Sequence, residues 1–324
     1  MQGLQQLRND LMRINGVFVA DSQPLAPLTT MKVGGRAKIF LMPESVSALE
    51  NVLKLLAQSG VSYKIIGNGS NLIVPDEGVK VVLSLCRLKA IDRYKRDVLY
   101  VEAGCTMAGL LLWCIKNGFA GMEPLAGIPG SIGGALFMNA GANGVQLGDF
   151  VSEILLTSSH GSAWMSVPKG FFGYRKSQIP PGTVVSAAKI RLSAKKSGYQ
   201  QEEPISGSHL VATSPSQILG NIKKIMKKRL NNQPLGRPSA GCVFRNPSES
   251  CSAWALIASC GLQGKRINDA QVSTKHANFI INLGNATSRD VLDLMTLVKK
   301  RVWEETGIFL KEEVVVWDHE EKIS

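Results

Sequence analysis

Paired cysteines and long apolar runs are both missing from this sequence. The six cysteines among the 324 residues form no C-x-x-C pair, which argues against a disulfide framework and against a zinc site, so we predict no metal. The longest apolar stretch, Ala108–Ile115, is far shorter than the roughly 20 residues that cross a bilayer. The first residues carry scattered charges and lack a secretory signal pattern. We therefore expect a cytoplasmic protein in a reducing compartment, with no contact to a membrane.

Two familiar nucleotide-binding motifs are also missing. The chain has neither the G-x-G-x-x-G pattern of a dinucleotide-binding βαβ unit nor the G-x-x-x-x-G-K-[ST] pattern of a P-loop, which disfavours a P-loop kinase and a nicotinamide-only dehydrogenase. Aromatic residues make up only 6% of the chain. Positive charge is in excess, because 37 Lys and Arg against 25 Asp and Glu give a net charge of +12. The electrostatic field of such a protein attracts anions.

A short glycine loop is the first candidate site. It consists of Gly67, Asn68, Gly69, Ser70 and Asn71. The glycines permit positive φ angles and a close approach of the backbone, and successive amides in such a loop can form a concave anion site. Asn-Gly is also a common hairpin signal, so the loop alone leaves an ordinary turn open.

A longer tract of small residues follows at 127–144. So many glycines and alanines cannot build a core, but they let the main chain lie against a flat or highly charged ligand. The alternative, a flexible loop, is weakened by apolar residues that look anchored, such as Ile132 and Leu136. From Ser131 onward the tract could present a helix N-terminus to a pyrophosphate. The residues expected to hold a dinucleotide here are Gly127, Ile128, Pro129, Gly130, Ser131, Gly133, Gly134, Asn139 and Gly141.

Hydrophobic periodicity and punctuation predict α+β units. In the first unit we expect a helix at 44–59 and strands at 63–66, 72–74 and 79–83. In the second we expect a strand at 98–102, a helix at 106–117, two short strands and a strand at 183–192, followed by a linker at 193–215. In the third we expect helices at 216–230 and 287–306, a strand at 279–282 and a last strand at 308–317. The domains are expected at 1–93, 94–205 and 206–307, with residues 308–324 returning to the first.

Seven spaced motifs carry a resemblance to a known family. They are T-T-M-K-V-G-G at 29–35, G-N-G-S-N-L-I-V at 67–74, G-I-P-G-S-I-G-G-A at 127–135, F-G-Y-R-K-S at 172–177, G-C-V-F-R-N-P at 241–247, H-A-N-F-I-I-N at 276–282 and L-K-E-E-V at 310–314. In this order, over about residues 22–316, they resemble the UDP-N-acetylenolpyruvoylglucosamine reductase (MurB) family.

The resemblance implies a fold and an activity. The fold is α+β with three domains, of which two form a vanillyl-alcohol-oxidase type unit around FAD and the third binds the UDP-sugar. NADPH reduces the FAD, and hydride then passes to the enolpyruvyl ether to give UDP-N-acetylmuramate for peptidoglycan. The four histidines lie outside the glycine tracts, so we expect a non-covalent FAD.

The resemblance also implies roles for single residues. Arg175 and Glu313 match the family's arginine and terminal glutamate, which stabilise an enolate-like intermediate. Tyr174, Arg229, Arg245 and Asn246 are expected to contact the substrate. The usual proton donor is serine, and this chain has Cys242 at that place, where we expect a positive neighbourhood to lower the pKa of the thiol.

The resemblance leaves other questions open. There is no room between Ile154 and Tyr174 for the segment that carries a substrate-covering tyrosine, so the chain resembles the shorter branch of the family. Another FAD-dependent oxidase of the same fold is one alternative. A basic nucleic-acid-binding protein is an alternative of a different class, prompted by the run Lys223–Arg229, although no aromatic residue interleaves with it. We predict a monomer whose partner is a small UDP-sugar and not a nucleic acid.

Overall fold

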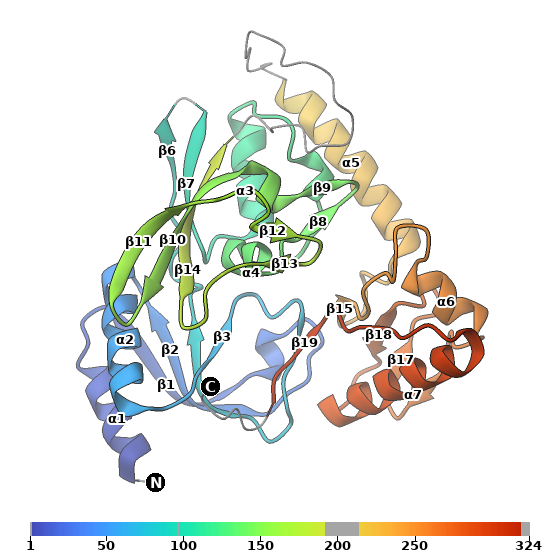
Figure 1. Cartoon of the computed structure of the whole chain (residues 1–324), viewed down its shortest axis with the longest axis horizontal. Coiled ribbons are helices and arrows are strands. Elements are labelled where there is room, and N and C mark those ends of the chain that lie inside the picture. Colours follow the sequence, from blue (N-terminus) through green and yellow to red (C-terminus); the bar gives the residue numbers. More distant parts are fainter. Residues whose placement is uncertain (1, 96, 192–213, 319–324) are drawn as a thin grey trace.

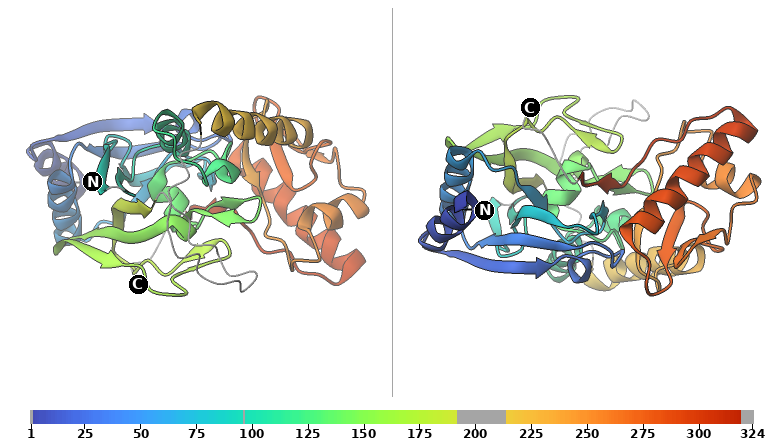
Figure 2. Two further views of the ribbon diagram at one scale, coloured as in Figure 1. Left: turned by 90° about the horizontal axis from the view of Figure 1, so that it is seen from above. Right: turned by 90° about the horizontal axis from the view of Figure 1, so that it is seen from below.

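Three β-sheets organise the chain in the computed structural model, which describes residues 2–95, 97–191 and 214–318 (Figure 1). Two of the sheets lie together in one body, and the third stands apart at one end of the molecule (Figure 2). Helices and strands both contribute to each part, so the expected α+β class is confirmed. Most of the expected linker at 193–215 and the expected boundary after residue 205 lie outside the described residues.

The first sheet has the order β1-β2-β5-β3, in which β1 and β2 are antiparallel and the other two pairs are parallel. This part of the chain contains α1 (Gln2–Met12), β1 (Val17–Pro24), β2 (Arg36–Pro43), α2 (Val46–Ser59), β3 (Lys64–Ile66), β4 (Leu72–Ile73) and β5 (Val79–Ser84), of which β4 lies outside the four-stranded sheet. Helix α2 begins after Ser45, whose side chain accepts a hydrogen bond from Ala48 N, and it ends at Gly60 in a left-handed conformation. The helix at 44–59 and the three strands after it were expected, whereas α1, β1 and β2 were not.

The second sheet is antiparallel, with the order β11-β10-β14-β7-β6. Its strands are β6 (Ile91–Lys95), β7 (Val98–Glu102), β10 (Val151–Ser158), β11 (Gly161–Ser166) and β14 (Val184–Arg191). Helices α3 (Met107–Lys116) and α4 (Ile132–Phe137) and the hairpins β8 (Gly141–Ala142) with β9 (Val145–Gln146) and β12 (Phe172–Gly173) with β13 (Lys176–Ser177) complete this part. The sheet begins at Ile91, so the boundary expected between residues 93 and 94 falls inside β6.

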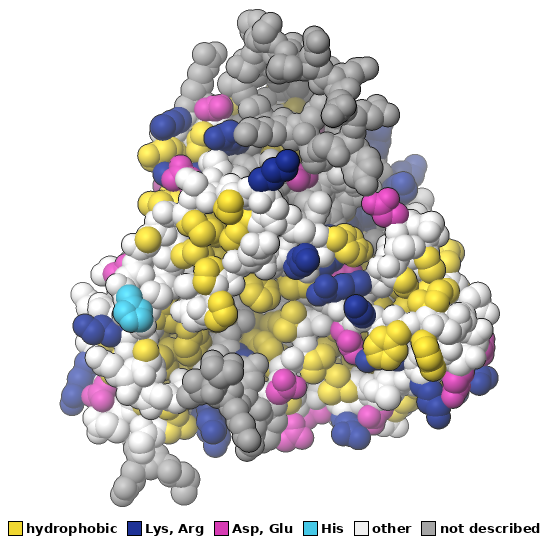
Figure 3. All heavy atoms as spheres, viewed as in Figure 1, with side chains coloured by type: hydrophobic (Ala, Val, Ile, Leu, Met, Phe, Trp, Pro, Cys, Tyr) yellow, Lys and Arg dark blue, Asp and Glu magenta, His cyan; other side chains and the backbone are white. Residues whose placement is uncertain are grey.

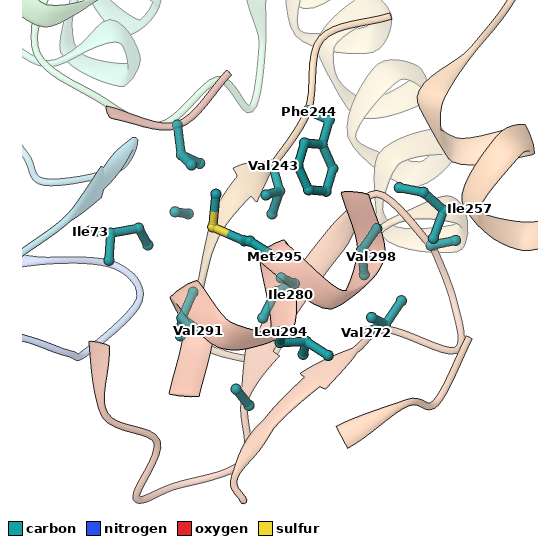
Figure 4. Packing of buried hydrophobic residues seen from close by; sticks show 14 of the residues in the cluster. Ile73, Val243, Phe244, Ile257, Val272, Ile280, Val291, Leu294, Met295 and Val298 are labelled. Atoms are coloured by element: carbon teal, nitrogen blue, oxygen red, sulfur yellow. The ribbon is translucent and has the colours of Figure 1, made fainter. Parts of the chain in front are cut away.

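The third sheet has the antiparallel order β15-β18-β17-β16 and is covered by α7. This part of the chain contains α5 (Pro215–Asn232), β15 (Ser239–Cys242), α6 (Ala253–Ser259), β16 (Arg266–Ile267), β17 (Ala270–Val272), β18 (Phe279–Asn282) and α7 (Ser288–Thr306), of which α5 packs on the core of the second unit through Ile222 and Ile225. Helix α7 starts at the expected capping box of Thr287 and Asp290 and ends at Gly307. Its apolar face meets the sheet, and Ile73 from β4 reaches the same core (Figure 4).

The third sheet is attached to the first unit by the end of the chain. Strand β19 (Val315–Val316) runs parallel to β4, with Val315 opposite Leu72 (Figure 1). The expected strand at 308–317 is wrong in length, because only two of its residues pair as a strand and residues 308–314 cross between the units as an extended segment with one isolated bridge. Asp76 adds a second attachment by accepting hydrogen bonds from Ser288 N at 2.9 Å and Arg289 N at 3.2 Å.

Candidate active site

A cavity of about 750 Å³ lies where the three parts meet. Its walls come from the loop 67–72, the tract 128–143, the segments 183–185 and 240–242, the end of α5 and the C-terminal residues up to Trp317. On the face shown in Figure 3, Lys and Arg side chains gather beside a hollow between the third sheet and the rest of the molecule. Residues from all three parts therefore face one shared cavity.

The loop Gly67–Asn71 lines this cavity and fits an anionic group. Among the described residues, no acceptor takes a hydrogen bond from the backbone N–H groups of Asn68, Gly69 or Ser70. Gly69 has a φ of +59°, and a Cβ there would lie 2.2 Å from Leu28 O. Free amides on successive residues are what a pyrophosphate requires from a backbone cradle.

The two glycine tracts pack directly on each other. A Cβ at Gly67 would lie 2.3 Å from Ser131 Oγ, and Ser70 Oγ donates to Pro129 O at 3.1 Å. The glycines are therefore used to bring two backbone segments together along one wall of the cavity. The sequence of neither tract indicated that it would pack against the other.

Helix α4 does not offer the free N-terminus that the sequence suggested. Ile132 N donates to Cys105 O at 2.8 Å, Gly133 N donates to Ala103 O at 2.9 Å, and Gly134 N donates to Ser131 Oγ at 3.4 Å. These amides are used within the protein, so the prediction of a helix N-terminus facing a pyrophosphate is wrong. The tract contributes a close-packed surface instead, through Ile128, Pro129, Gly130, Ser131, Gly133, Gly134 and Gly141, which all line the cavity.

Arg175 lies at the tip of the β12–β13 hairpin, whose two turn residues are Tyr174 and Arg175. Its φ is +54°, a conformation that is uncommon for a residue with a side chain and that the turn imposes. Arg175 Nε donates to Glu313 Oε1 at 2.6 Å, and Arg175 Nη2 donates to Gly141 O at 2.9 Å. The remaining guanidinium N–H groups can bind a carboxylate in the cavity.

Glu313 is held from both sides through its backbone. Its N–H donates to Val243 O at 2.7 Å, next to Cys242, and its carbonyl oxygen accepts from Asn71 Nδ2 at 3.1 Å. Asn71 of the glycine loop therefore fixes the backbone that carries the Glu313 carboxylate. Burial raises the pKa of Glu313 above its usual value, and the charges of Arg175 and Arg245 oppose this rise.

Cys242 enters the cavity at a β-bulge. Ser239 pairs with Ile281 and Cys242 with Phe279, so three steps along β15 match two along β18, and Gly241 takes up the extra residue with a φ of +81°. Burial and the charge of Glu313 raise the pKa of the Cys242 thiol to about 12, although Arg175 and Arg229 oppose the rise. The expectation of a lowered pKa is therefore wrong, because desolvation outweighs the two cations.

The end of α5 supplies residues that the motifs did not indicate. Ile225, Lys228, Asn232 and Gln233 line the cavity together with Arg229, which was expected to contact substrate. Burial lowers the pKa of Arg229, and its Nε is buried without a hydrogen-bond partner in the described part of the chain. The run of cationic residues at 223–229 could have indicated that this helix contributes to the site. A charged helix face usually only contacts solvent, so the run alone did not predict it.

Five expected site residues lie outside the lining of the cavity. Gly127 packs against Arg229, since a Cβ there would lie 2.9 Å from its Nε. Tyr174 is half exposed, and its ring lies against the Arg175 guanidinium. The charge of Arg245 opposes the rise in the pKa of Glu313. Asn246 accepts a hydrogen bond from Ala253 N at the start of α6, and Asn139 is buried within the protein.

Comparisons with known proteins agree with this architecture. A family model described as "FAD binding domain" matches residues 37–164, and one described as "UDP-N-acetylenolpyruvoylglucosamine reductase, C-terminal domain" matches residues 233–317. The fold and the cavity thus define an FAD-dependent oxidoreductase with a separate C-terminal domain.

Relatives over the whole chain specify the class further. The chain is 38% identical to "UDP-N-acetylenolpyruvoylglucosamine reductase" of Geobacter metallireducens, over 95% of this chain and 94% of that protein. It is 37% identical to the protein of the same description from Thermotoga maritima, over 89% and 95%. The crystal structure of UDP-N-acetylenolpyruvylglucosamine reductase (MurB) from Thermus caldophilus matches with a TM-score of 0.74 and 32% identity, over 93% of this chain and 99% of that chain. This chain belongs to the UDP-N-acetylenolpyruvoylglucosamine reductase family.

Proposed function

We propose that this protein reduces UDP-N-acetylenolpyruvoylglucosamine to UDP-N-acetylmuramate, a precursor of peptidoglycan, with NADPH as the reductant. The observation that carries the proposal is the Arg175–Glu313 pair in a cavity that also holds a neutral thiol, Cys242. An oxidase that acts on a simple alcohol has no need of this combination.

The chemistry explains why the three groups are required together. Hydride addition to an enol ether beside a carboxylate places negative charge on that carboxylate and on the adjacent carbon. The site must then supply a cation for the carboxylate, a hydrogen-bonding group for the developing charge and a proton for the carbon. Arg175 supplies the cation, Glu313 the hydrogen bond and Cys242 the proton.

Glu313 has two compatible functions in this scheme. Its hydrogen bond to Arg175 orients the guanidinium, and the raised pKa favours a proton on its carboxyl group when a negative charge develops nearby. A protonated carboxyl group donates a hydrogen bond to an enolate oxygen, which an ionised one cannot do.

Cys242 replaces the serine that is usual in the family and can act as its equivalent. The raised pKa keeps the thiol protonated throughout the physiological pH range, so the proton is present when the carbon needs it. The thiol is still a stronger acid than a serine hydroxyl in the same surroundings.

The amides of the loop Gly67–Asn71 would hold the pyrophosphate of a non-covalent FAD, and Gly130, Ser131, Gly133 and Gly134 would provide the surface beside it. When bound, it supplies a hydride that it has taken from NADPH. Lys228 and Arg229 add positive charge at the same cavity, where the UDP pyrophosphate also has to be neutralised.

The remaining assignments follow from this activity. A monomer in the cytoplasm suffices, because the site is built from one chain and the substrate is a small nucleotide sugar. No helix among the described residues is long and apolar enough to cross a membrane. The chain belongs to the shorter branch of the family, without the tyrosine segment that covers the substrate.

Two measurements test the proposal. Purified protein should show the visible absorbance of a flavin, and acid precipitation should leave that flavin in the supernatant. NADPH consumption should depend on UDP-N-acetylenolpyruvoylglucosamine. Protein that binds no flavin even after FAD is added, or that consumes NADPH at the same rate without the sugar nucleotide, would contradict it.

A further inference from the structure

Asn139 was expected to bind the cofactor, yet it is 1% exposed and does not line the cavity. It follows α4 and has a φ of +43°, a left-handed conformation that asparagine tolerates better than most residues. Its side chain is nevertheless fully engaged. Asn139 Nδ2 donates to Gln146 Oε1 at 2.6 Å and to Gly173 O at 2.9 Å, and Asn139 Oδ1 accepts from Gly148 N at 3.0 Å.

The bond to Gly173 links Asn139 to the arginine of the active site. Gly173 is the last residue of β12, directly before the turn formed by Tyr174 and Arg175. The hairpin is short, since Gly173 pairs with Lys176 and only one further pair closes it. The turn places Arg175 at a φ of +54°, and the hydrogen bond from Asn139 to Gly173 O holds the strand that leads into this turn.

The same asparagine also lies close in sequence to the acceptor of Arg175. Arg175 Nη2 donates to Gly141 O, and Gly141 lies two residues after Asn139 at the start of β8. Asn139 thus donates a hydrogen bond to the strand that leads to Arg175. It also belongs to the segment in which Gly141 accepts a hydrogen bond from Arg175. It sets the spacing between the two.

The surroundings leave little room for adjustment. A Cβ at Gly148 would lie 2.5 Å from the Phe172 ring and 2.8 Å from Asn139 Oδ1. Both N–H groups of the Asn139 amide are already donated inside the protein, so neither is available to a ligand.

We propose that Asn139 is a positioning residue that holds Arg175 in place for substrate binding and reduction, through its hydrogen bond to Gly173 and the fixed spacing to Gly141. This inference rests on the proposed function for the reaction, while the placement of Arg175 can be measured without any reaction.

Asn139→Asp is the selective variant. The carboxylate has nearly the shape of the amide and still accepts from Gly148 N, but it turns an oxygen without hydrogen towards Gly173 O and Gln146 Oε1. Asn117→Asp is the matched control, because Asn117 Nδ2 also donates to a backbone carbonyl, Trp113 O at 2.8 Å, on an exposed site. Asn139→Gly, which accepts the same backbone conformation, replaces the first variant if that variant does not retain FAD.

The kinetic test compares the two half-reactions. In Asn139→Asp we expect reoxidation of the reduced flavin by UDP-N-acetylenolpyruvoylglucosamine to slow by about 10-fold or more, with reduction by NADPH within about twofold of the parent. In an Arg175→Ala background the same change should have almost no further effect, because its target is gone. Equal slowing of both half-reactions, or a full additional loss in the Arg175→Ala background, would overturn the inference.

The second test needs no substrate and separates this inference from the proposed function. The Nε–H resonance of Arg175, assigned from its loss in Arg175→Lys, should shift or broaden in Asn139→Asp and keep its position in Asn117→Asp. An unchanged Arg175 resonance in folded Asn139→Asp would refute the positioning role even if the enzyme reduces its substrate. If the parent protein fails to reduce the substrate while this resonance responds, only the proposed function fails.

Discussion

Arg175 and Glu313 are 138 residues apart in the sequence, and their side chains meet at 2.6 Å. Both side chains are mostly buried, with 21% and 16% of their surface exposed. The arginine comes from a hairpin of the second sheet unit and the glutamate from the segment that joins the third sheet to the first. The pair therefore forms only when all three parts are correctly assembled.

Replacing Glu313 by glutamine should affect stability with a definite dependence on pH. Burial raises the pKa of Glu313, so the folded state penalises its ionised form relative to the unfolded chain. The penalty is absent at low pH, where the group is protonated in both states, and it grows as the pH rises through the raised pKa. The free energy of unfolding of Glu313→Gln, relative to the parent, should thus increase as the pH rises above the ordinary pKa of a glutamate and level off above the raised pKa.

Thermal unfolding of both proteins across that pH range measures the difference. A Glu313→Gln variant that loses stability relative to the parent as the pH rises would show that the ion pair with Arg175 outweighs burial. The same variant should reoxidise its flavin with substrate on the order of 100-fold more slowly, because an amide N–H is a far weaker acid than a carboxylic acid and stabilises the developing enolate charge less.

Replacing Cys242 tests the proton donor. Cys242→Ala should leave flavin reduction by NADPH unchanged and slow the step with the sugar nucleotide by about 100-fold or more, while Cys242→Ser stays active. Rapid-mixing measurement of each half-reaction separates the two steps. Equal rates for the alanine variant and the parent in both half-reactions would rule out an acid function for this thiol.

Alkylation of Cys242 should be slow at neutral pH and strongly pH-dependent. Only the thiolate reacts, and a pKa of about 12 leaves very little of it near pH 7. The rate of inactivation by iodoacetamide should increase about tenfold per pH unit up to pH 10, and substrate should protect. Mass spectrometry has to verify that Cys242 is the labelled residue. An inactivation rate that levels off near pH 8 would indicate a thiol with an ordinary pKa and would contradict the prediction.

Removing Asp76 should loosen the attachment of the third sheet unit. Its carboxylate accepts from two backbone amides at the start of α7, and loss of such a cap costs about 1 kcal/mol. Asp76→Ala should lower the free energy of unfolding by about that amount in denaturant titrations. Asp293→Ala is the control, because its exposed pair with Arg289 on the same helix contributes little; equal losses in the two variants would contradict the capping role.

Local signals in the sequence predicted most helices correctly. The predictions that failed depend on contacts between residues far apart in the sequence. The limits of α2 and α7 follow from Ser45, Gly60, the Thr287 capping box and Gly307, all of which are local. The strand expected at 308–317 was too long because apolar alternation cannot show that only Val315 and Val316 pair as a strand, with β4, whereas Glu312 makes only an isolated bridge to Phe244.

The motifs indicated part of the cavity lining, and they could not indicate the environment of each residue. Motifs indicated Arg175, Cys242 and Glu313, but the pKa of the thiol depends on how deeply the fold buries it. Asn139 lies in a glycine-rich tract that resembles a cofactor loop, and only its three hydrogen bonds reveal that it supports a hairpin from elsewhere in the chain.

The most direct test of the central claim is an anaerobic experiment on the protein with FAD bound. NADPH should bleach the flavin absorbance, and UDP-N-acetylenolpyruvoylglucosamine added afterwards should restore it in a single turnover, with a product two mass units heavier than the substrate. A flavin that NADPH reduces and that stays bleached with this sugar nucleotide, while oxygen restores its colour, would contradict the account.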